Sequence, residues 1–92
     1  MAALSAPEVA ANLSRVPAWT VENGELVRSF QFEDFRASMR FVNQVAGLAE
    51  EAGHHPDIDI RYNRVRLALV THDAGGLTAK DFDLAAQADE LV

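Results

Sequence analysis

The sequence predicts an α+β domain with a four-stranded antiparallel sheet and three helices on one face, in the order α-β-β-α-β-β-α. Two segments, 18–32 and 57–72, each hold two apolar stretches around a short turn signal, which is typical of hairpins. Three other segments repeat apolar residues at helical spacing. Short hairpins join antiparallel strands, so the four strands are expected to form an antiparallel sheet. Helices covering one face of that sheet give the simplest packing of these elements. We expect a single domain over residues 1–92.

The first helix is expected to begin at Ser5 and to end at Pro17. Ser5 and Glu8 have the spacing of a capping box, and the proline at position 7 is tolerated in a first turn. One apolar stripe follows, made of Val9, Leu13 and Val16.

The first hairpin turns at Asn23-Gly24, a pair that suits a type I′ turn because both residues tolerate positive φ. Its predicted strand residues are Trp19, Val21, Leu26, Phe30 and Phe32.

A long helix is predicted over residues 34–53, with Gly53 as the left-handed residue that ends it. Its main stripe consists of Phe35, Met39, Val42, Ala46 and Ala49, with Phe41, Val45 and Leu48 beside it. This apolar face is broad, so we expect part of it to meet another subunit.

The second hairpin begins with strict alternation of Ile58, Ile60 and Tyr62 with polar residues, which predicts a half-buried strand. A turn at Asn63-Arg64 leads to a strand over 65–72, and its arginines are expected to face acidic residues across the hairpin. In the last helix, Thr78 is the predicted N-cap with Asp81 at the N3 position. The apolar side of this helix consists of Phe82, Ala85, Ala88, Leu91 and Val92.

Composition excludes several functions. The net charge is −6 without any run of Lys or Arg, so binding of nucleic acid through a basic patch is not expected. The chain has no cysteine, which removes disulfides, thiolate nucleophiles and cysteine-based zinc sites. It shows neither a secretory signal nor a membrane span, and we expect a soluble cytoplasmic protein. At 92 residues its core is modest, which makes oligomerisation plausible.

The three histidines of the chain are predicted to gather at one edge of the sheet. His54 and His55 precede the second hairpin, and counting outward from its turn brings His72 back near them. Each histidine alone could be an ordinary turn or surface residue. Metal binding is disfavoured because adjacent side chains in extended chain diverge and no HxH or HxxxH spacing is present. Proton transfer is the third interpretation, since both forms of imidazole are available near neutrality.

Glu50 lies on the last turn of the long helix and can look towards this loop. Its carboxylate could hold an imidazole in one tautomer or accept N–H groups from a ligand, or it could simply be solvated like Glu51. Nothing indicates a covalent nucleophile, and the sequence DAGGLT at 73–78 lacks the lysine of a phosphate-binding loop.

These residues resemble the pterin-4a-carbinolamine dehydratases. The shared pattern consists of Glu50, His54-His55-Pro56, Tyr62, His72 and Asp81, and the run from Tyr62 to Asp89 and Trp19 also look like that family. The resemblance implies dehydration of 4a-hydroxytetrahydrobiopterin to quinonoid dihydropterin and water, a reaction that needs an acid and a base but no cofactor and no metal. It recycles the pterin left by aromatic amino-acid hydroxylases.

By the same resemblance His54, His55 and His72 form the catalytic set, with His54 or His55 as acid and His72 as its partner. Substrate binding is implied for Glu50, Pro56, Thr71 and Asp81. The family also forms dimers and tetramers, which implies a homodimer or homotetramer here. The chain departs from animal members at Ile58, where they commonly carry an aromatic residue, so its substrate range is open. The alternative function is a non-catalytic pterin-binding, dimerisation or regulatory module on the same fold.

Overall fold

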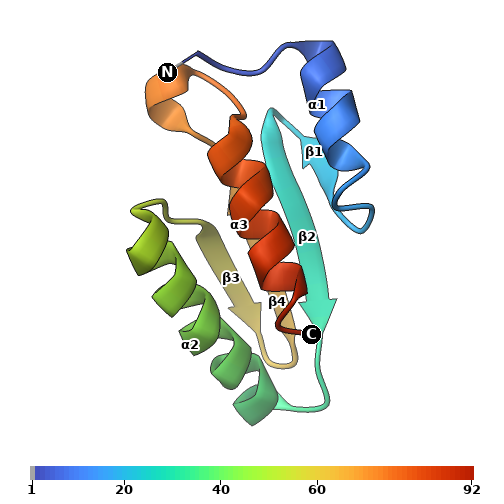
Figure 1. The fold of residues 1–92 in the computed structure, drawn as a ribbon. Coiled ribbons are helices and arrows are strands. Elements are labelled where there is room, and N and C mark those ends of the chain that lie inside the picture. Colours follow the sequence, from blue (N-terminus) through green and yellow to red (C-terminus); the bar gives the residue numbers. More distant parts are fainter. Residues whose placement is uncertain (1) are drawn as a thin grey trace.

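The computed structural model describes residues 2–92 and has the predicted order of helices and strands (Figure 1). Its elements are α1 (Ala6–Leu13), β1 (Thr20–Glu22), β2 (Glu25–Gln31), α2 (Phe35–Ala52), β3 (Asp57–Arg61), β4 (Arg64–Leu69), the 3₁₀ helix η1 (His72–Ala74) and α3 (Ala79–Asp89). No helix in this part of the chain has both the length and the hydrophobicity to cross a bilayer.

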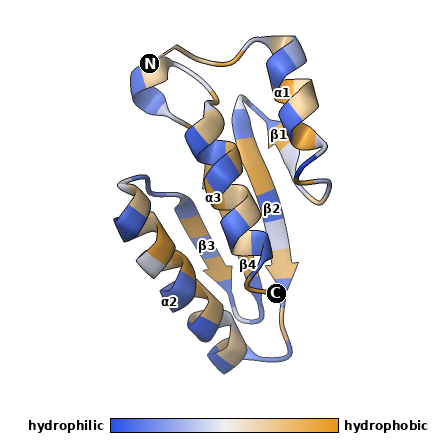
Figure 2. Ribbon diagram, viewed as in Figure 1, coloured by the Kyte–Doolittle hydropathy of each residue, from blue (hydrophilic) through white to orange (hydrophobic). Residues whose placement is uncertain are grey.

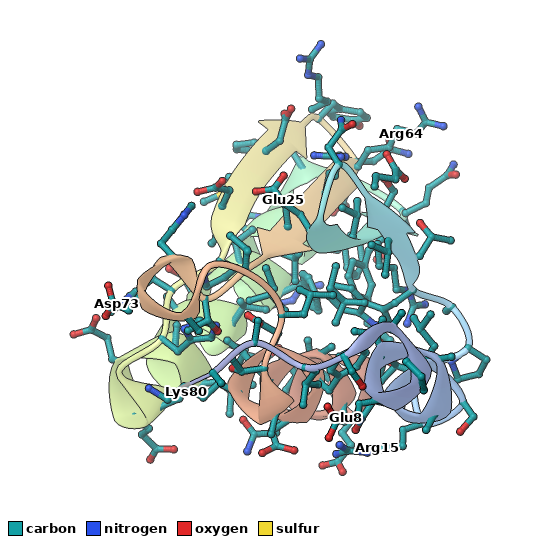
Figure 3. The ribbon with its side chains drawn as sticks, turned by 90° about the horizontal axis from the view of Figure 1, so that it is seen from above. Glu8, Arg15, Glu25, Arg64, Asp73 and Lys80 are labelled. Atoms are coloured by element: carbon teal, nitrogen blue, oxygen red, sulfur yellow. The ribbon has the colours of Figure 1, made fainter. Side chains whose placement is uncertain are left out.

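The four strands form one antiparallel sheet in the order β1-β2-β4-β3, so β1 and β3 are its two edges. In Figure 3 the helices lie on one side of this sheet, whereas Glu25 and Arg64 lie on the other. The predicted fold class, α+β with three helices on one face, is therefore confirmed.

The core forms between the sheet and the helices because alternate strand residues face the same side. Leu26 and Phe30 on β2 pair across the sheet with Leu69 and Val65 on β4, and all four are almost completely buried. Their partners in the helical layer are Phe41 and Val45 of α2 and Phe82, Leu84 and Ala85 of α3. Burying such side chains contributes roughly 1.5–3 kcal/mol each, which fixes α2 and α3 on the sheet.

The local signals that control the backbone conformation are confirmed at three places. Asn23 and Gly24 have φ angles of 52° and 79°, as a type I′ turn requires. The Ser5 hydroxyl accepts a hydrogen bond from the Glu8 amide, and the Glu8 carboxylate accepts one from the Ser5 amide, which completes the capping box. Gly53 ends α2 in the left-handed conformation.

Several predicted boundaries are wrong, among them the end of the strand predicted over residues 65–72, which is β4 and stops at Leu69, while His72 begins η1. Helix α1 ends at Leu13 rather than at Pro17, and a turn with a hydrogen bond from the Val16 amide to the Leu13 carbonyl follows it. The second hairpin turns at Tyr62-Asn63, one residue earlier than predicted, so Arg61 pairs with Arg64. Asn63 instead contacts Phe32, the residue that follows β2: its carbonyl accepts from the Phe32 amide, and its side-chain amide donates to the Phe32 carbonyl. As a result only Arg66 faces an acidic residue, Asp59, across the hairpin.

The predicted half-buried strand is also wrong for the isolated chain, because every residue of β3 is exposed. Figure 2 shows hydrophobic and hydrophilic bands alternating along β3, so the pattern is present, but its apolar side is left 36% exposed at Ile58 and 37% at Ile60. The buried face of α2 likewise differs from the predicted main stripe. Ser38, Phe41, Val45 and Ala49 are buried, whereas Phe35 is 50% exposed and Ala46 is exposed.

Candidate active site

The end of α2 determines where His54 lies. Gly53 has φ of 61° and ψ of 32°, a left-handed conformation that glycine adopts without steric cost. The chain then turns back so that the amide of His54 donates to the carbonyl of Ala49 at 3.1 Å, a common way to satisfy a helix C-terminus. A backbone hydrogen bond therefore anchors His54 to the last turn of α2.

The side chain of His54 forms a buried pair with Asp81 of α3. Its Nε2 lies 2.5 Å from Asp81 Oδ1, and the two side chains are 10% and 0% exposed. A carboxylate with no access to water needs several donors, because burying an unpaired charge costs several kcal/mol. Asp81 thus requires partners beyond one imidazole.

Those partners come from the cap of α3 and from the segment after β4. The other oxygen of Asp81, Oδ2, accepts from the backbone amide of Thr78 and from the hydroxyl of Thr71, both at 2.9 Å. The hydroxyls of Thr71 and Thr78 lie 2.8 Å apart, and no buried polar side-chain atom within residues 2–92 lacks a partner. A fully bonded network of this kind holds its members in one geometry.

This network decides which nitrogen of His54 is free. When Asp81 is ionised its carboxylate only accepts hydrogen bonds, so His54 Nε2 then donates a proton to Asp81 Oδ1. Neutral His54 then has its lone pair on Nδ1. The pair can therefore take up a proton at Nδ1 while Asp81 balances the positive charge of the imidazolium.

A second imidazole–carboxylate pair lies on the surface. His55 Nε2 is 2.6 Å from Glu50 Oε2, and these side chains are 62% and 77% exposed. Such an exposed pair adds about 0–1 kcal/mol to stability. The two neighbouring histidines thus bond different carboxylates in different surroundings, as the expected divergence of adjacent side chains implies. The carboxylate of Glu50 makes one of the contacts considered from the sequence, that to an imidazole.

His72 does not contact the other two histidines through any hydrogen bond or ion pair recorded for residues 2–92. Asp57 pairs with Ala68 across this hairpin. Continuing the same antiparallel register beyond the end of β3 places Thr71, not His72, opposite His54. His72 begins η1 and is exposed. It borders a hollow of about 390 Å³ together with the Asn23-Gly24 turn.

The remaining predicted site residues differ in accessibility. Pro56 is half-buried and Ile58 is 36% exposed, whereas Thr71 is 8% exposed and Asp81 is completely buried. Thr78 is a member of the site that sequence reasoning treated only as a helix cap. Its spacing to Asp81 was the available signal, because a capping carboxylate at N3 still has a second oxygen to offer. In residues 2–92, no three His, Cys, Asp or Glu side chains converge as metal ligands would.

Comparison with known proteins assigns this arrangement to a family. Residues 2–91 match the family model described as "Pterin 4 alpha carbinolamine dehydratase". Relatives with the name "Putative pterin-4-alpha-carbinolamine dehydratase" include one from Chloroflexus aurantiacus, 62% identical over 92 residues with 100% of this chain and 99% of the relative covered. One from Acidobacterium capsulatum is 61% identical, with 100% of both chains covered.

Two solved structures have similar folds. A protein from Brucella melitensis, described as a transcriptional coactivator/pterin dehydratase, is 32% identical, with a TM-score of 0.93 and 97% of each chain covered. A pterin dehydratase-like protein, identified as a RuBisCO assembly factor in the alpha-carboxysome, is 26% identical with a TM-score of 0.65. That alignment covers 79% of this chain and 84% of the other.

Proposed function

The chain belongs to the pterin-4a-carbinolamine dehydratase family, and we propose that it dehydrates 4a-hydroxytetrahydrobiopterin to quinonoid dihydropterin and water. The buried pair of His54 and Asp81 carries this proposal. The reaction needs a base at N5 and an acid at the 4a-hydroxyl group. An imidazole that is held in one tautomer beside a buried carboxylate is suited to such proton transfer.

In the proposed mechanism His54 is the base. Its Nδ1 accepts the proton of N5, and the electron pair of the N–H bond forms the C4a=N5 double bond while the C4a–O bond breaks. Asp81 balances the charge that develops on the imidazole. Because Thr71 and Thr78 hold Asp81 in place, the base does not reorganise during the step.

His55 is the proposed acid. Its protonated form is balanced by Glu50, and it gives its proton to the leaving hydroxyl, which departs as water. The exposure of both side chains lets bulk solvent return the proton after each turnover. In this assignment His72 completes the catalytic set as a contact to the pterin ring, and Pro56 with the neighbouring Ile58 borders the substrate.

Turnover of chemically generated 4a-hydroxytetrahydropterin, followed by ultraviolet absorbance, tests the proposal. Replacing His54 or His55 with Ala should lower kcat/KM by roughly 10²–10⁴-fold, the usual contribution of a positioned acid or base. Loss at His72 should appear mainly in KM. If the wild-type protein does not accelerate dehydration above the rate in buffer, the proposed activity is wrong.

The alternative function is a non-catalytic pterin-binding, dimerisation or regulatory module. One protein of similar fold is a RuBisCO assembly factor, so this fold also serves in assembly. The intact hydrogen-bond network around Asp81 favours the enzyme, since a scaffold has no need of a fixed histidine tautomer. Tight binding of a dihydropterin without any turnover of the hydroxypterin would favour the module.

We further propose that the protein forms a homodimer or homotetramer through its uncovered apolar strip. The edge strand β3 presents Ile58 and Ile60, 36% and 37% exposed, on the side of the sheet that the helices face. Tyr62 and Phe35, with Met39, border a neighbouring hollow of about 490 Å³. An unpaired edge with exposed apolar side chains is a ready site for pairing with another chain.

A further inference from the structure

The face of the sheet that no helix covers carries its own cluster of side chains. Because strand residues alternate, the register places Ser29, Asp59 and Arg66 in one row across this face. Arg61 and Arg64 form the next pair towards the hairpin turn. Figure 3 shows Arg64 on this side of the sheet, away from the helices.

These five residues line a hollow of about 300 Å³. It lies near the Tyr62-Asn63 turn, whereas His54 precedes the opposite end of β3 and bonds to a helix on the other face. The hollow is therefore separate from the candidate active site.

The charge of the hollow is opposite to that of the protein. Three of the eight Lys and Arg residues line it, with Asp59 as the one carboxylate, although the chain carries −6 overall. Arg61 bonds Asp59 at 3.2 Å, and Arg66 reaches Glu22 at 3.5 Å. Arg64 has no ion pair recorded with any residue of the 2–92 range.

The pairing of Arg61 with Arg64 is unfavourable by itself. Like charges directly opposite each other on neighbouring strands destabilise a sheet, and here they meet across a two-residue turn. An anion between the two guanidinium groups would remove this repulsion. The Ser29 hydroxyl could donate to the same anion.

We propose that this hollow binds a phosphate-type oxyanion, either free or as part of a phosphorylated small molecule. Guanidinium groups bind phosphate through paired N–H donors, and such charge-assisted bonds are stronger than neutral ones. Arg64 supplies donors that no carboxylate occupies, while Arg61 and Arg66 each keep donors beyond their single ion pair.

The size of the ligand follows from the range of electrostatic interactions. At physiological ionic strength charges are screened over about 8 Å, so a small anion experiences mainly the charges of the hollow and its border. These are three arginines against Asp59 and Glu22, which leave a positive balance. A long polyanion such as nucleic acid would also meet the acidic remainder of the surface and would be repelled. The hollow therefore fits one or two phosphate groups.

Titration of the ¹⁵N-labelled protein with sodium pyrophosphate, at ionic strength held constant with sodium chloride, tests this proposal. Saturable shifts are expected at the backbone amides of Ser29, Arg61, Arg64 and Arg66. Arg64→Gln should weaken binding roughly tenfold, the effect of losing one charge-assisted interaction. Arg40→Gln is the matched control, because it removes the same charge from α2 on the opposite face and should leave the affinity unchanged.

Asp59→Asn gives an independent prediction of the opposite sign. Removing the one carboxylate of the hollow frees Arg61 and should strengthen pyrophosphate binding several-fold. A second titration, with inorganic phosphate, shows how many phosphate groups the hollow needs. A site for a single phosphate binds phosphate and pyrophosphate equally, whereas a site for linked phosphates prefers pyrophosphate. Dehydratase turnover should stay at the wild-type level in Arg64→Gln, so this inference stands or fails separately from the proposed function.

Three results would overturn the proposal. Shifts that do not saturate, or that Arg40→Gln weakens as much as Arg64→Gln, would reveal only general charge attraction. Equal binding of citrate or glutamate would remove the preference for phosphate. A change of oligomeric state in Arg64→Gln without pyrophosphate binding would show that a second copy of the chain occupies the hollow.

Discussion

Replacing Asp81 with Asn should separate the role of its charge from the role of its shape. The amide is nearly the same size as the carboxylate, but it has one acceptor oxygen and one NH₂ donor. Thr71 and Thr78 both donate to Oδ2 of Asp81, so the amide oxygen is expected to take that position. The NH₂ group then faces Nε2 of His54, which must give up its proton to accept a hydrogen bond.

Two energies follow from these contacts. If the imidazole keeps its original tautomer, two donors face each other and a charge-assisted bond worth about 1.5–3 kcal/mol is lost. If it changes tautomer, most of that energy is recovered, but Nδ1 now carries the proton and cannot act as a base. In serine proteases the same change of carboxylate to amide lowers turnover about 10⁴-fold for this reason. We expect a fall of roughly 10²–10⁴-fold in kcat/KM with a loss of stability below ~3 kcal/mol.

The assay combines three measurements on Asp81→Asn. Turnover of 4a-hydroxytetrahydropterin gives kcat/KM, urea unfolding gives stability, and long-range ¹H–¹⁵N correlation gives the tautomer of His54. Asp83→Asn is the matched control, because Asp83 lies on the same helix and its carboxylate is 62% exposed in a pair with Arg15. Asp83→Asn should leave turnover and tautomer unchanged. Wild-type kcat/KM together with an altered tautomer in Asp81→Asn would refute the assignment of His54 as base.

Three further perturbations test other parts of the structure. In Gly53→Ala the added methyl group meets no neighbouring atom, but alanine must adopt the positive φ of this position. Urea unfolding should therefore show a loss of stability of about 1 kcal/mol. The value of kcat should also fall, because His54 follows this residue. Ile60→Glu places a charge on the proposed interface, and sedimentation should show dissociation towards monomers, whereas an unchanged oligomer would exclude β3 from the contact. Hydrogen bonds from the backbone amide and then the side chain of Ser5 hold the pKa of Glu8 below its ordinary value. This stabilisation is present above the unfolded pKa and is lost as the pH falls through the folded pKa. Ser5→Ala keeps the backbone amide and removes only the hydroxyl, so an NMR titration should show a partial rise of the Glu8 pKa, and an unchanged value would exclude a contribution of the hydroxyl.

Those parts of the fold that depend on local chemistry were predictable. The predicted turn at Asn23-Gly24 and the predicted helix end at Gly53 are correct, because few residue types tolerate a positive φ. The turn of the second hairpin was placed one residue late because Tyr62 adopts a φ of 51°, which is unusual for a bulky residue and which no local pattern signals. The burial of β3 was misjudged for a different reason: alternation shows which side is apolar, but not whether anything covers it.

In the candidate site, too, the features set by local sequence were predictable and those set by tertiary packing were not. Counting along the hairpin correctly brought the segment after β4 to His54, but the shifted turn means that Thr71 and not His72 arrives there. The contact of His54 with Asp81 could not be derived from spacing, because it joins the end of α2 to the first turn of α3 through the tertiary packing of two helices. Only the resemblance to a family placed Asp81 in the site.

The adjacent positions of His54 and His55 have a physical consequence in this arrangement. One left-handed glycine turns the chain out of α2, and the next two side chains must then point in different directions. The first, His54, points to a carboxylate that water cannot reach, while His55 points to one that water surrounds. A single helix end thus supplies one imidazole bonded to a buried carboxylate and one that lies beside solvent. Inserting a residue between His54 and His55 should preserve the fold of α2 but abolish this division, because both side chains would then leave the same side of the chain.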